Sequence, residues 1–205
     1  MRERYPHTWK YLKRFEPILR ERAAFKRYFT REDRGGKVIE TGPFYSMFDV
    51  GDYTFAPWKV VWTRIAQISA AVVNEQDGKP VIPQETITLV SCESEREAHY
   101  ITALVNSAPF QFAASSYSQE GGKSMGSMHV LEHIRIPKYD PADQVHQALA
   151  QASKEAHEAA ARGNEARLRE IEERINTLAA QLWGLTHKEV IIIHSDLGAL
   201  VGGKG

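Results

Sequence analysis

Of the 205 residues, 42% are hydrophobic and 25% are charged, which is the composition of an ordinary globular protein of one or two domains. The sequence has no apolar run of the roughly 20 residues that cross a membrane, and no apolar signal core at the start. The formal net charge is zero, so the chain lacks the overall basic excess of a stand-alone nucleic-acid binder. Cys92 is the only cysteine, which excludes a disulfide or a cysteine metal cluster within the chain, and we expect a cytoplasmic protein without a membrane partner.

Two short helices are predicted at the start of the chain. Apolar residues recur at helical spacing from Thr8 to Phe15, and Pro17 fits the first position of a second helix that continues to Phe25. Charged residues and glycines then predict a loop from Thr30 to Gly42.

The charges are unevenly distributed along the sequence. Twelve of the 26 basic residues lie before residue 38, whereas glutamates gather between residues 155 and 173. This asymmetry is compatible with a DNA-facing body and a solvent-facing or protein-facing end. A charged face that only keeps the protein in solution is the alternative for any single residue.

Aromatic residues accumulate after the predicted loop. They are Phe44, Tyr45, Phe48, Tyr53, Phe55, Trp58 and Trp62. Aromatic residues interleaved with basic ones can stack on bases that have left a duplex. Large aromatic side chains more often fill the core of a small sheet, and we expect this of most of them.

Three strands are predicted in the middle of the chain. Lys59 to Ile65 alternates, Ala70 to Val73 is a second strand, and Thr86 to Cys92 is a third with Ile87 and Leu89 inward. A turn around Asp77-Gly78 separates the second from the third. Short strands, glycine turns and intervening helices predict an α+β fold with a mixed, largely antiparallel sheet and flanking helices.

The next stretch combines a well-marked helix with a polar loop. Ser94 and Glu97 form a capping box, and the helix from Glu95 to Asn106 ends before Pro109, because a proline disfavours helical geometry in the residue before it. A loop is predicted from Ser115 to Ser127, followed by an extended segment from Leu131 to Pro137.

An antiparallel helical hairpin is predicted near the C-terminus. Asp140 and Pro141 start its first helix, Gly163-Asn164 ends it, and the second helix runs from about Glu165 to Trp183. The inward side of the first helix consists of small residues, which permits close packing against another helix.

Several of these segments carry a family resemblance when they are taken in order. They are Tyr5 to Leu12, Phe55 to Trp62, the helix end Leu104-Val105-Asn106-Ser107 with the loop behind it, Ile134-Arg135-Ile136-Pro137, and Leu182 to Thr186. From about residue 5 to residue 197, the chain resembles the TaqI-like C-terminal specificity domain of adenine-specific DNA methyltransferases in type IIG restriction-modification enzymes. It is more distantly similar to the specificity subunits of type I systems.

The resemblance implies a sequence-specific DNA-recognition domain that binds double-stranded DNA together with a methyltransferase catalytic domain, upstream in a longer chain or in a partner subunit. S-adenosylmethionine would bind to that catalytic domain, and no cofactor is expected in this chain. The sequence lacks the glycine-rich cofactor turn, and Ser107-Ala108-Pro109-Phe110 has alanine where the adenine-binding motif has its first proline. We therefore expect no catalytic residues here.

Two further patterns are weak signals for a ligand site. Gly121-Gly122-Lys123-Ser124 lacks the earlier glycine of a nucleotide phosphate loop, because Tyr117 occupies that position. A loop that presents Lys123 and Ser124 to DNA phosphates is the preferred interpretation, and a plain surface loop is the alternative. His129 and His133 lie in a segment predicted to be extended, too far apart to share a metal ion easily, so no metal ligands are expected.

Charge and loop position select eight candidate DNA-contact residues. They are Arg34, Lys37, Tyr45, Lys59, Arg64, Lys79, Lys123 and Ser124. We expect a recognition domain in residues 1–139, the hairpin and a C-terminal capping segment in residues 140–197, and a disordered tail in residues 198–205.

The alternative function is a protein-protein interaction and assembly module. In that hypothesis the hairpin from Pro141 to Trp183 docks on another subunit through the small residues of its first helix. Bulky substitutions at Ala152 or Ala156 would then abolish assembly while DNA binding is retained.

Overall fold

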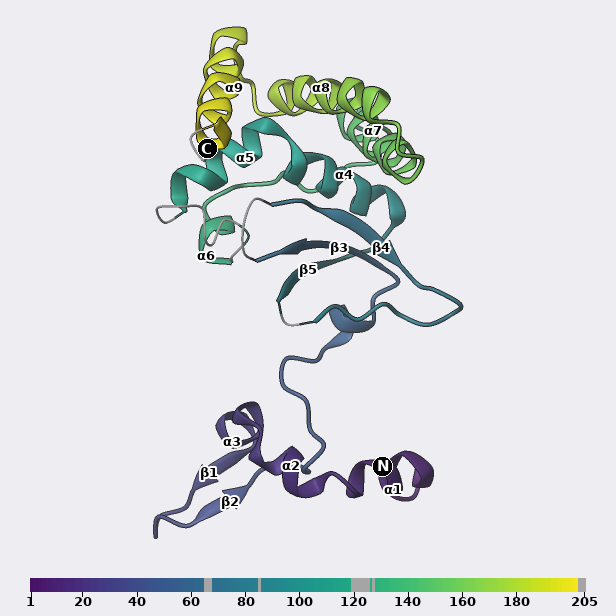
Figure 1. The fold of residues 1–205 in the computed structure, drawn as a ribbon, viewed down its shortest axis with the longest axis vertical. Coiled ribbons are helices and arrows are strands. Elements are labelled where there is room, and N and C mark those ends of the chain that lie inside the picture. Colours follow the sequence, from purple (N-terminus) through teal and green to yellow (C-terminus); the bar gives the residue numbers. More distant parts are fainter. Residues whose placement is uncertain (65–67, 85, 119–125, 127, 203–205) are drawn as a thin grey trace. The chain divides into compact units, whose positions relative to one another are not determined.

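Two small antiparallel sheets and a set of helices build this chain, which confirms the α+β class (Figure 1). The structure is a computed structural model that describes residues 1–64, 68–84, 86–118, 126 and 128–202. The chain divides into two compact units, Met1–Asp52 and Tyr53–Gly205. We call them the N-terminal unit and the C-terminal unit.

Short helices come first in the N-terminal unit. They are α1 (Pro6–Lys13), α2 (Glu16–Glu21) and α3 (Ala23–Tyr28). Pro6 and Pro17 lie within the first two positions of α1 and α2, where the missing N–H breaks no helical hydrogen bond. The single helix predicted from Pro17 to Phe25 was wrong, because Arg22 adopts an extended ψ of 133° between α2 and α3. Its guanidinium donates to the carbonyls of Phe44 and Ser46, over 3.0 and 2.8 Å.

A β-hairpin follows where a loop was predicted from Thr30 to Gly42. Strands β1 (Thr30–Glu32) and β2 (Val38–Glu40) pair antiparallel, with Arg31 opposite Ile39. The loop prediction was wrong for the strands, because the glycines and turn-forming residues are confined to residues 33–37. In this unit Phe25 and Phe44 are the buried hydrophobic side chains.

The C-terminal unit contains the second sheet, and all three of its strands were predicted. After the 3-10 helix η1 (Asp52–Phe55) come β3 (Trp58–Thr63), β4 (Ala71–Asn74) and β5 (Ile87–Cys92), antiparallel in the order β4-β3-β5. The predicted turn is confirmed, with positive φ at Asp77 (51°) and Gly78 (69°). The expectation that Ile87 and Leu89 point inward was wrong, because the opposite face of β5, with Thr88 and Cys92, is the buried one.

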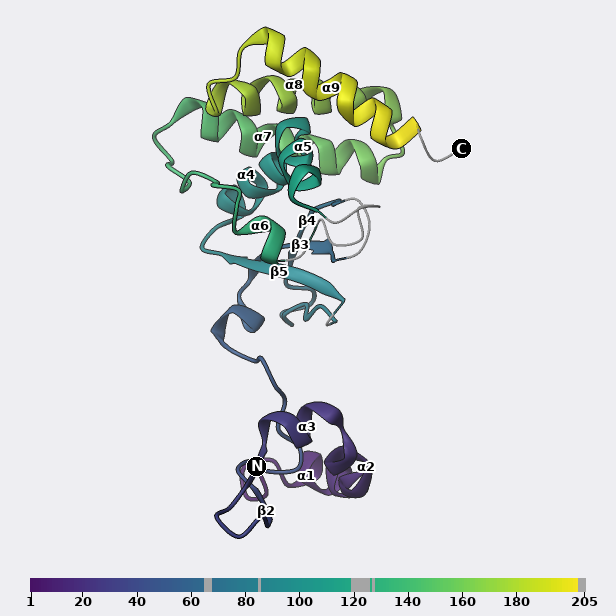
Figure 2. The same cartoon turned by 90° about the vertical axis from the view of Figure 1, so that its left-hand side faces the viewer.

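Helix α4 (Glu95–Asn106) lies between the sheet and the later helices, as both views show (Figures 1 and 2). Its capping box is confirmed: Ser94 Oγ accepts a hydrogen bond from the Glu97 N–H over 3.2 Å. Ala98 and Val105 pack in one core with the sheet, while Tyr100 and Leu104 pack in a second core with the helical hairpin. Both sides of α4 are therefore buried.

A helix replaces the start of the predicted polar loop. Helix α5 (Ala108–Tyr117) includes Ser115 to Tyr117, and its first N–H donates to Asn176 Oδ1 over 2.8 Å. Residues 119–125 and 127 of the predicted loop lie outside the described part. The predicted extended segment from Leu131 to Pro137 was wrong at its start, because α6 (Met128–Leu131) is helical.

The predicted hairpin is present as α7 (Gln144–Ala161) and α8 (Glu165–Leu182), with Gly163 at a φ of 65° between them. Asp143 rather than Asp140 caps α7, through hydrogen bonds from the amides of residues 145 and 146. The hairpin packs on α4 inside the C-terminal unit.

Helix α9 (His187–Gly202) ends the described chain. A capping box stands at its start, because the Thr186 N–H donates to Glu189 Oε2 over 2.7 Å. Disorder was predicted from Gly198, but residues 198–202 continue this helix, and residues 203–205 lie outside the described part. No helix in the described ranges is long and apolar enough to cross a membrane.

Candidate nucleic-acid interface

Two of the predicted DNA-contact residues, Arg34 and Lys37, lie together in the turn between β1 and β2. Every residue from Arg31 to Val38 is exposed. Tyr45 belongs to the same unit but is only partly exposed, with its ring edge-on to Phe44 at a centroid distance of 5.1 Å. The hairpin turn therefore brings two of the cationic candidates to one place.

Asp33 fixes the shape of this turn. Its Oδ1 atom accepts hydrogen bonds from the N–H groups of Gly35 and Lys37, over 2.8 and 3.0 Å. The backbone adds bonds from Asp33 N–H to Lys37 O (2.9 Å) and from Gly36 N–H to Asp33 O (3.1 Å), and Gly36 has a φ of 76°. Sequence reasoning did not single out Asp33, although an aspartate two residues before a glycine pair is a known turn signal.

Basic and aromatic side chains pair on the surface of the N-terminal unit. Arg2 and Lys13 lie over the Trp9 ring at 5.1 and 5.7 Å, and Arg27 lies over Tyr28 at 5.2 Å. The Tyr28 ring in turn stacks on Phe48, with centroids 3.5 Å apart. Each exposed cation–π pair contributes about 0.5–1 kcal/mol. Basic side chains therefore contact aromatic rings in this unit, among them those of Trp9 and Tyr28.

Lys59 is not on the surface. Its side chain is 1% exposed, and its Nζ donates to the Ala56 carbonyl over 2.5 Å. Burial lowers the pKa of this ammonium group, and the carboxylate of Glu75 partly opposes the shift. In this arrangement Lys59 holds the start of β3 against the preceding segment, and we no longer include it among the DNA-contact candidates.

The remaining candidates are dispersed. Arg64 and Lys79 are both exposed, but they lie beyond opposite ends of β3, because Val61 pairs with Ala71 while Trp58 pairs with Asn74. Lys123 and Ser124 lie outside the described residues.

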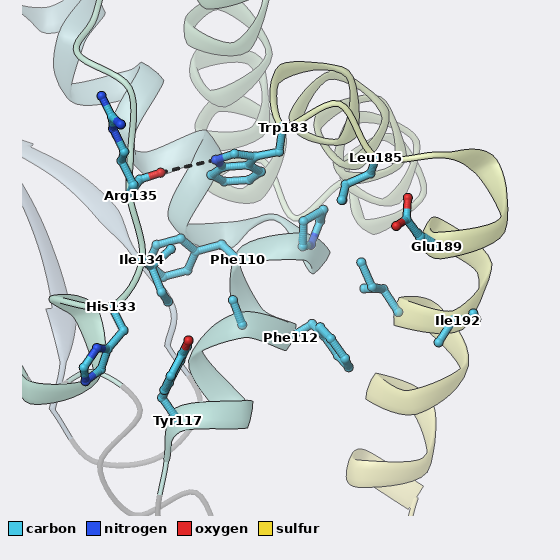
Figure 3. A pocket seen from close by; sticks show the side chains of 13 residues that line it. Phe110, Phe112, Tyr117, His133, Ile134, Arg135, Trp183, Leu185, Glu189 and Ile192 are labelled. Atoms are coloured by element: carbon cyan, nitrogen blue, oxygen red, sulfur yellow. Dashed lines mark hydrogen bonds between the residues drawn. The ribbon is translucent and has the colours of Figure 1, made fainter.

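An apolar cleft lies between α5, α9 and residues 133–135 of the C-terminal unit (Figure 3). It has a volume of about 510 Å³ and is lined by side chains such as Phe110, Phe112 and Ile192. The Trp183 indole N–H at its edge donates to the Arg135 carbonyl over 3.3 Å. Sequence reasoning missed this cleft, because most of α5 and α9 was not recognised as helix.

The near-miss adenine motif does not fit a base-binding role. Ser107 Oγ donates to the Leu104 carbonyl over 2.6 Å, and the Phe110 ring is 2% exposed within the core beside the sheet. Both side chains have structural partners, so the segment forms no cradle for a flipped adenine. Among the described residues, no group of three His, Cys, Asp or Glu side chains is arranged to hold a metal ion.

About half of this chain is similar to a region of a type II methyltransferase. The relative is the type II methyltransferase M.NspV of Nostoc sp. (strain ATCC 29411 / PCC 7524), 29% identical over 109 residues. The match covers 53% of this chain and 20% of M.NspV, so this chain spans only a small part of that protein. No family model and no solved structure matches the chain.

Proposed function

We propose that this chain is the sequence-specific DNA-recognition part of an adenine-specific DNA methyltransferase or restriction-modification enzyme. It positions double-stranded DNA for methyl transfer by a catalytic domain outside these 205 residues, in the same polypeptide or in a partner subunit. The similarity to M.NspV carries the proposal, because it links the chain to a methyltransferase while matching only a fifth of that protein.

The charge distribution supports DNA as the partner. The N-terminal unit holds twelve basic and eight acidic residues, an excess of four positive charges, whereas the remaining residues hold fourteen basic and eighteen acidic ones. A local basic excess attracts the phosphate backbone even in a chain of zero net charge. The zero net charge of the whole chain therefore does not argue against DNA binding by the N-terminal unit.

Methyl transfer itself is assigned to the associated catalytic domain. The segment Ser107 to Phe110, which comes nearest to an adenine-binding motif, is occupied by packing within the fold. S-adenosylmethionine is accordingly the cofactor of the other domain in this proposal, and this chain contributes DNA binding and orientation.

The small residues of α7, on which the alternative assembly function was based, are not available to another subunit. Ala152 and Ala159 of α7 are buried in the core that α7 forms with α4 and α8 of the same chain. This small-residue face is therefore occupied within the C-terminal unit, and we do not retain the hypothesis that it docks on another subunit.

Selection from a randomised duplex DNA pool tests the proposed function. The 205-residue chain is used for selection, and its affinity for the best duplex and for a scrambled duplex is then measured across a salt series. We expect a defined motif with a preference of at least about a hundredfold, which is within the range of specific DNA-binding proteins. Equal binding of both duplexes, or no binding at low salt, would overturn the proposal.

A further inference from the structure

The β1–β2 hairpin is largely exposed in the N-terminal unit. Its turn, residues 33–37, projects beyond helices α1 to α3 in both views of this unit (Figures 1 and 2). All of these turn residues are exposed. The hairpin turn and the adjoining ends of both strands, residues 31–38, are therefore accessible to a binding partner.

The turn is also held in one shape before any partner binds. The Asp33 carboxylate and the backbone of residues 33–37 make four hydrogen bonds across it. A segment that is already ordered loses less conformational entropy when it binds, which favours affinity and a fixed orientation of its side chains.

Internal partners engage two of the three acidic groups of the hairpin. The Asp33 carboxylate accepts from the turn amides, and Glu40 on β2 forms an ion pair with Arg20 of α2, which also pairs with Glu16. Glu32 remains as an exposed carboxylate among three exposed cationic side chains, those of Arg31, Arg34 and Lys37. The charges that the hairpin presents outward are thus predominantly positive.

We propose that this hairpin enters the major groove of the recognised duplex, with Arg34 at the base edges and Lys37 on the phosphate backbone; the inference rests on the proposed function. The major groove, about 12 Å wide, admits a two-stranded β-ribbon. An arginine there bonds both acceptors of a guanine, and an exposed glutamate such as Glu32 accepts from a cytosine amino group. The ribbon presents both an arginine and a glutamate, Arg34 and Glu32, at or beside its turn.

The test compares variants of the 205-residue chain on the duplex selected above, by fluorescence anisotropy across a salt series. Arg34→Ala is expected to weaken binding to this duplex at least about tenfold and to relax the base preference at one position. Lys37→Ala is expected to weaken selected and scrambled duplexes alike, and to lower the slope of log affinity against log salt by about 1.

Two further variants separate the roles. Arg34→Lys keeps the charge but loses the planar fork, so it should retain the salt slope and lose the base preference. Arg162→Ala is the matched control, because this arginine lies after α7 in the other unit with 76% of its side chain exposed. It removes the same charge and should leave affinity within about twofold, since exposed ion pairs such as the one with Glu158 contribute little.

The outcomes distinguish the two proposals. If the unaltered chain shows no preferred duplex, the proposed function fails and the groove assignment fails with it. If the unaltered chain binds its duplex specifically but Arg34→Ala and Lys37→Ala bind as tightly as Arg162→Ala, only the hairpin assignment is overturned. Circular dichroism and thermal unfolding of each variant confirm that a loss of binding is not a loss of fold.

Discussion

The side-chain amide of Asn106 at the end of α4 forms two hydrogen bonds with the backbone of Ala70, just before β4. Asn106 Oδ1 accepts from the Ala70 N–H, and Asn106 Nδ2 donates to the Ala70 carbonyl, each over 2.8 Å. The Asn106 side chain thus satisfies both backbone polar groups of Ala70, which is buried, as a neighbouring strand would do. This gives a physical reason for asparagine in the helix end Leu104-Val105-Asn106-Ser107.

Replacement of this amide should destabilise the chain measurably. We expect Asn106→Ala to lower the free energy of unfolding by about 1–3 kcal/mol, because it leaves two polar backbone groups without their partner. Urea unfolding followed by tryptophan fluorescence measures the loss. Gln151→Ala on the exposed side of α7 is the control and should change stability by less than about 0.5 kcal/mol. Equal stabilities of the two variants would contradict the anchoring role.

Gly126 is close to the sheet and should not tolerate a side chain. Its carbonyl accepts hydrogen bonds from the Trp62 indole N–H and from Thr88 Oγ1, both over 3.1 Å. A Cβ atom at Gly126 would overlap the Thr63 carbonyl oxygen and approach the Trp62 ring to 2.9 Å. We expect Gly126→Ala to lower the free energy of unfolding by about 1–3 kcal/mol, because it overpacks a buried position.

Gly198 provides the matched control for this substitution. It lies in α9 with no atom within 4 Å of an added Cβ. Gly198→Ala should be neutral or stabilising by up to about 1 kcal/mol, because alanine favours a helix over glycine. Thermal unfolding compares the two variants. A melting temperature of Gly126→Ala equal to that of the unaltered chain would contradict the close approach.

Local signals predicted the elements that depend mainly on local chemistry. The capping box at Ser94, the break at Gly163 and the turn at Asp77-Gly78 were all predicted, because each rests on hydrogen bonds or φ angles of neighbouring residues. The face of β5 was predicted wrongly, since Thr88 is buried by a distant partner, the Gly126 carbonyl. Such long-range contacts leave no local signal.

The candidate site also contains residues whose exposure follows from local sequence and others whose burial depends on distant contacts. Arg34 and Lys37 were predicted from their position in a turn, and both are exposed. Lys59 has the same charge, but its side chain is buried in the C-terminal unit. Alternation along β3 cannot indicate which strand face is covered by a segment from elsewhere in the sequence. The role of Asp33 depends on its own turn and was within reach of sequence reasoning.

A bulky residue in α7 distinguishes internal packing from docking on another subunit. Ala152 is fully buried between α7 and its neighbours, so Ala152→Leu should lower the free energy of unfolding by about 1–3 kcal/mol. Ala160→Leu, on the exposed side of the same helix, should change it by less than about 0.5 kcal/mol. Chemical denaturation gives both values. A stable Ala152→Leu variant would show that this face is open rather than packed.

The buried His99 should make stability depend on pH. Its Nδ1 atom lies 3.1 Å from Ser153 Oγ, and burial, followed by the nearby His157 ring, lowers its pKa to about 4 from an ordinary 6.5. Lys154 acts in the same direction, and Glu95 opposes it. Above pH 6.5 the imidazole is neutral in both the folded and the unfolded chain, so it does not affect stability there.

As the pH falls from 6.5 towards 4, the unfolded chain binds a proton at His99 that the folded chain does not, and stability is lost. The full effect is about 3 kcal/mol, because each pH unit in this window contributes up to about 1.4 kcal/mol. His99→Gln cannot titrate, so its stability should fall less over this range than that of the unaltered chain, which urea unfolding at pH 7, 6, 5 and 4.5 measures. Parallel pH profiles of the two proteins, or an NMR titration of His99 near its ordinary pKa, would contradict the effect.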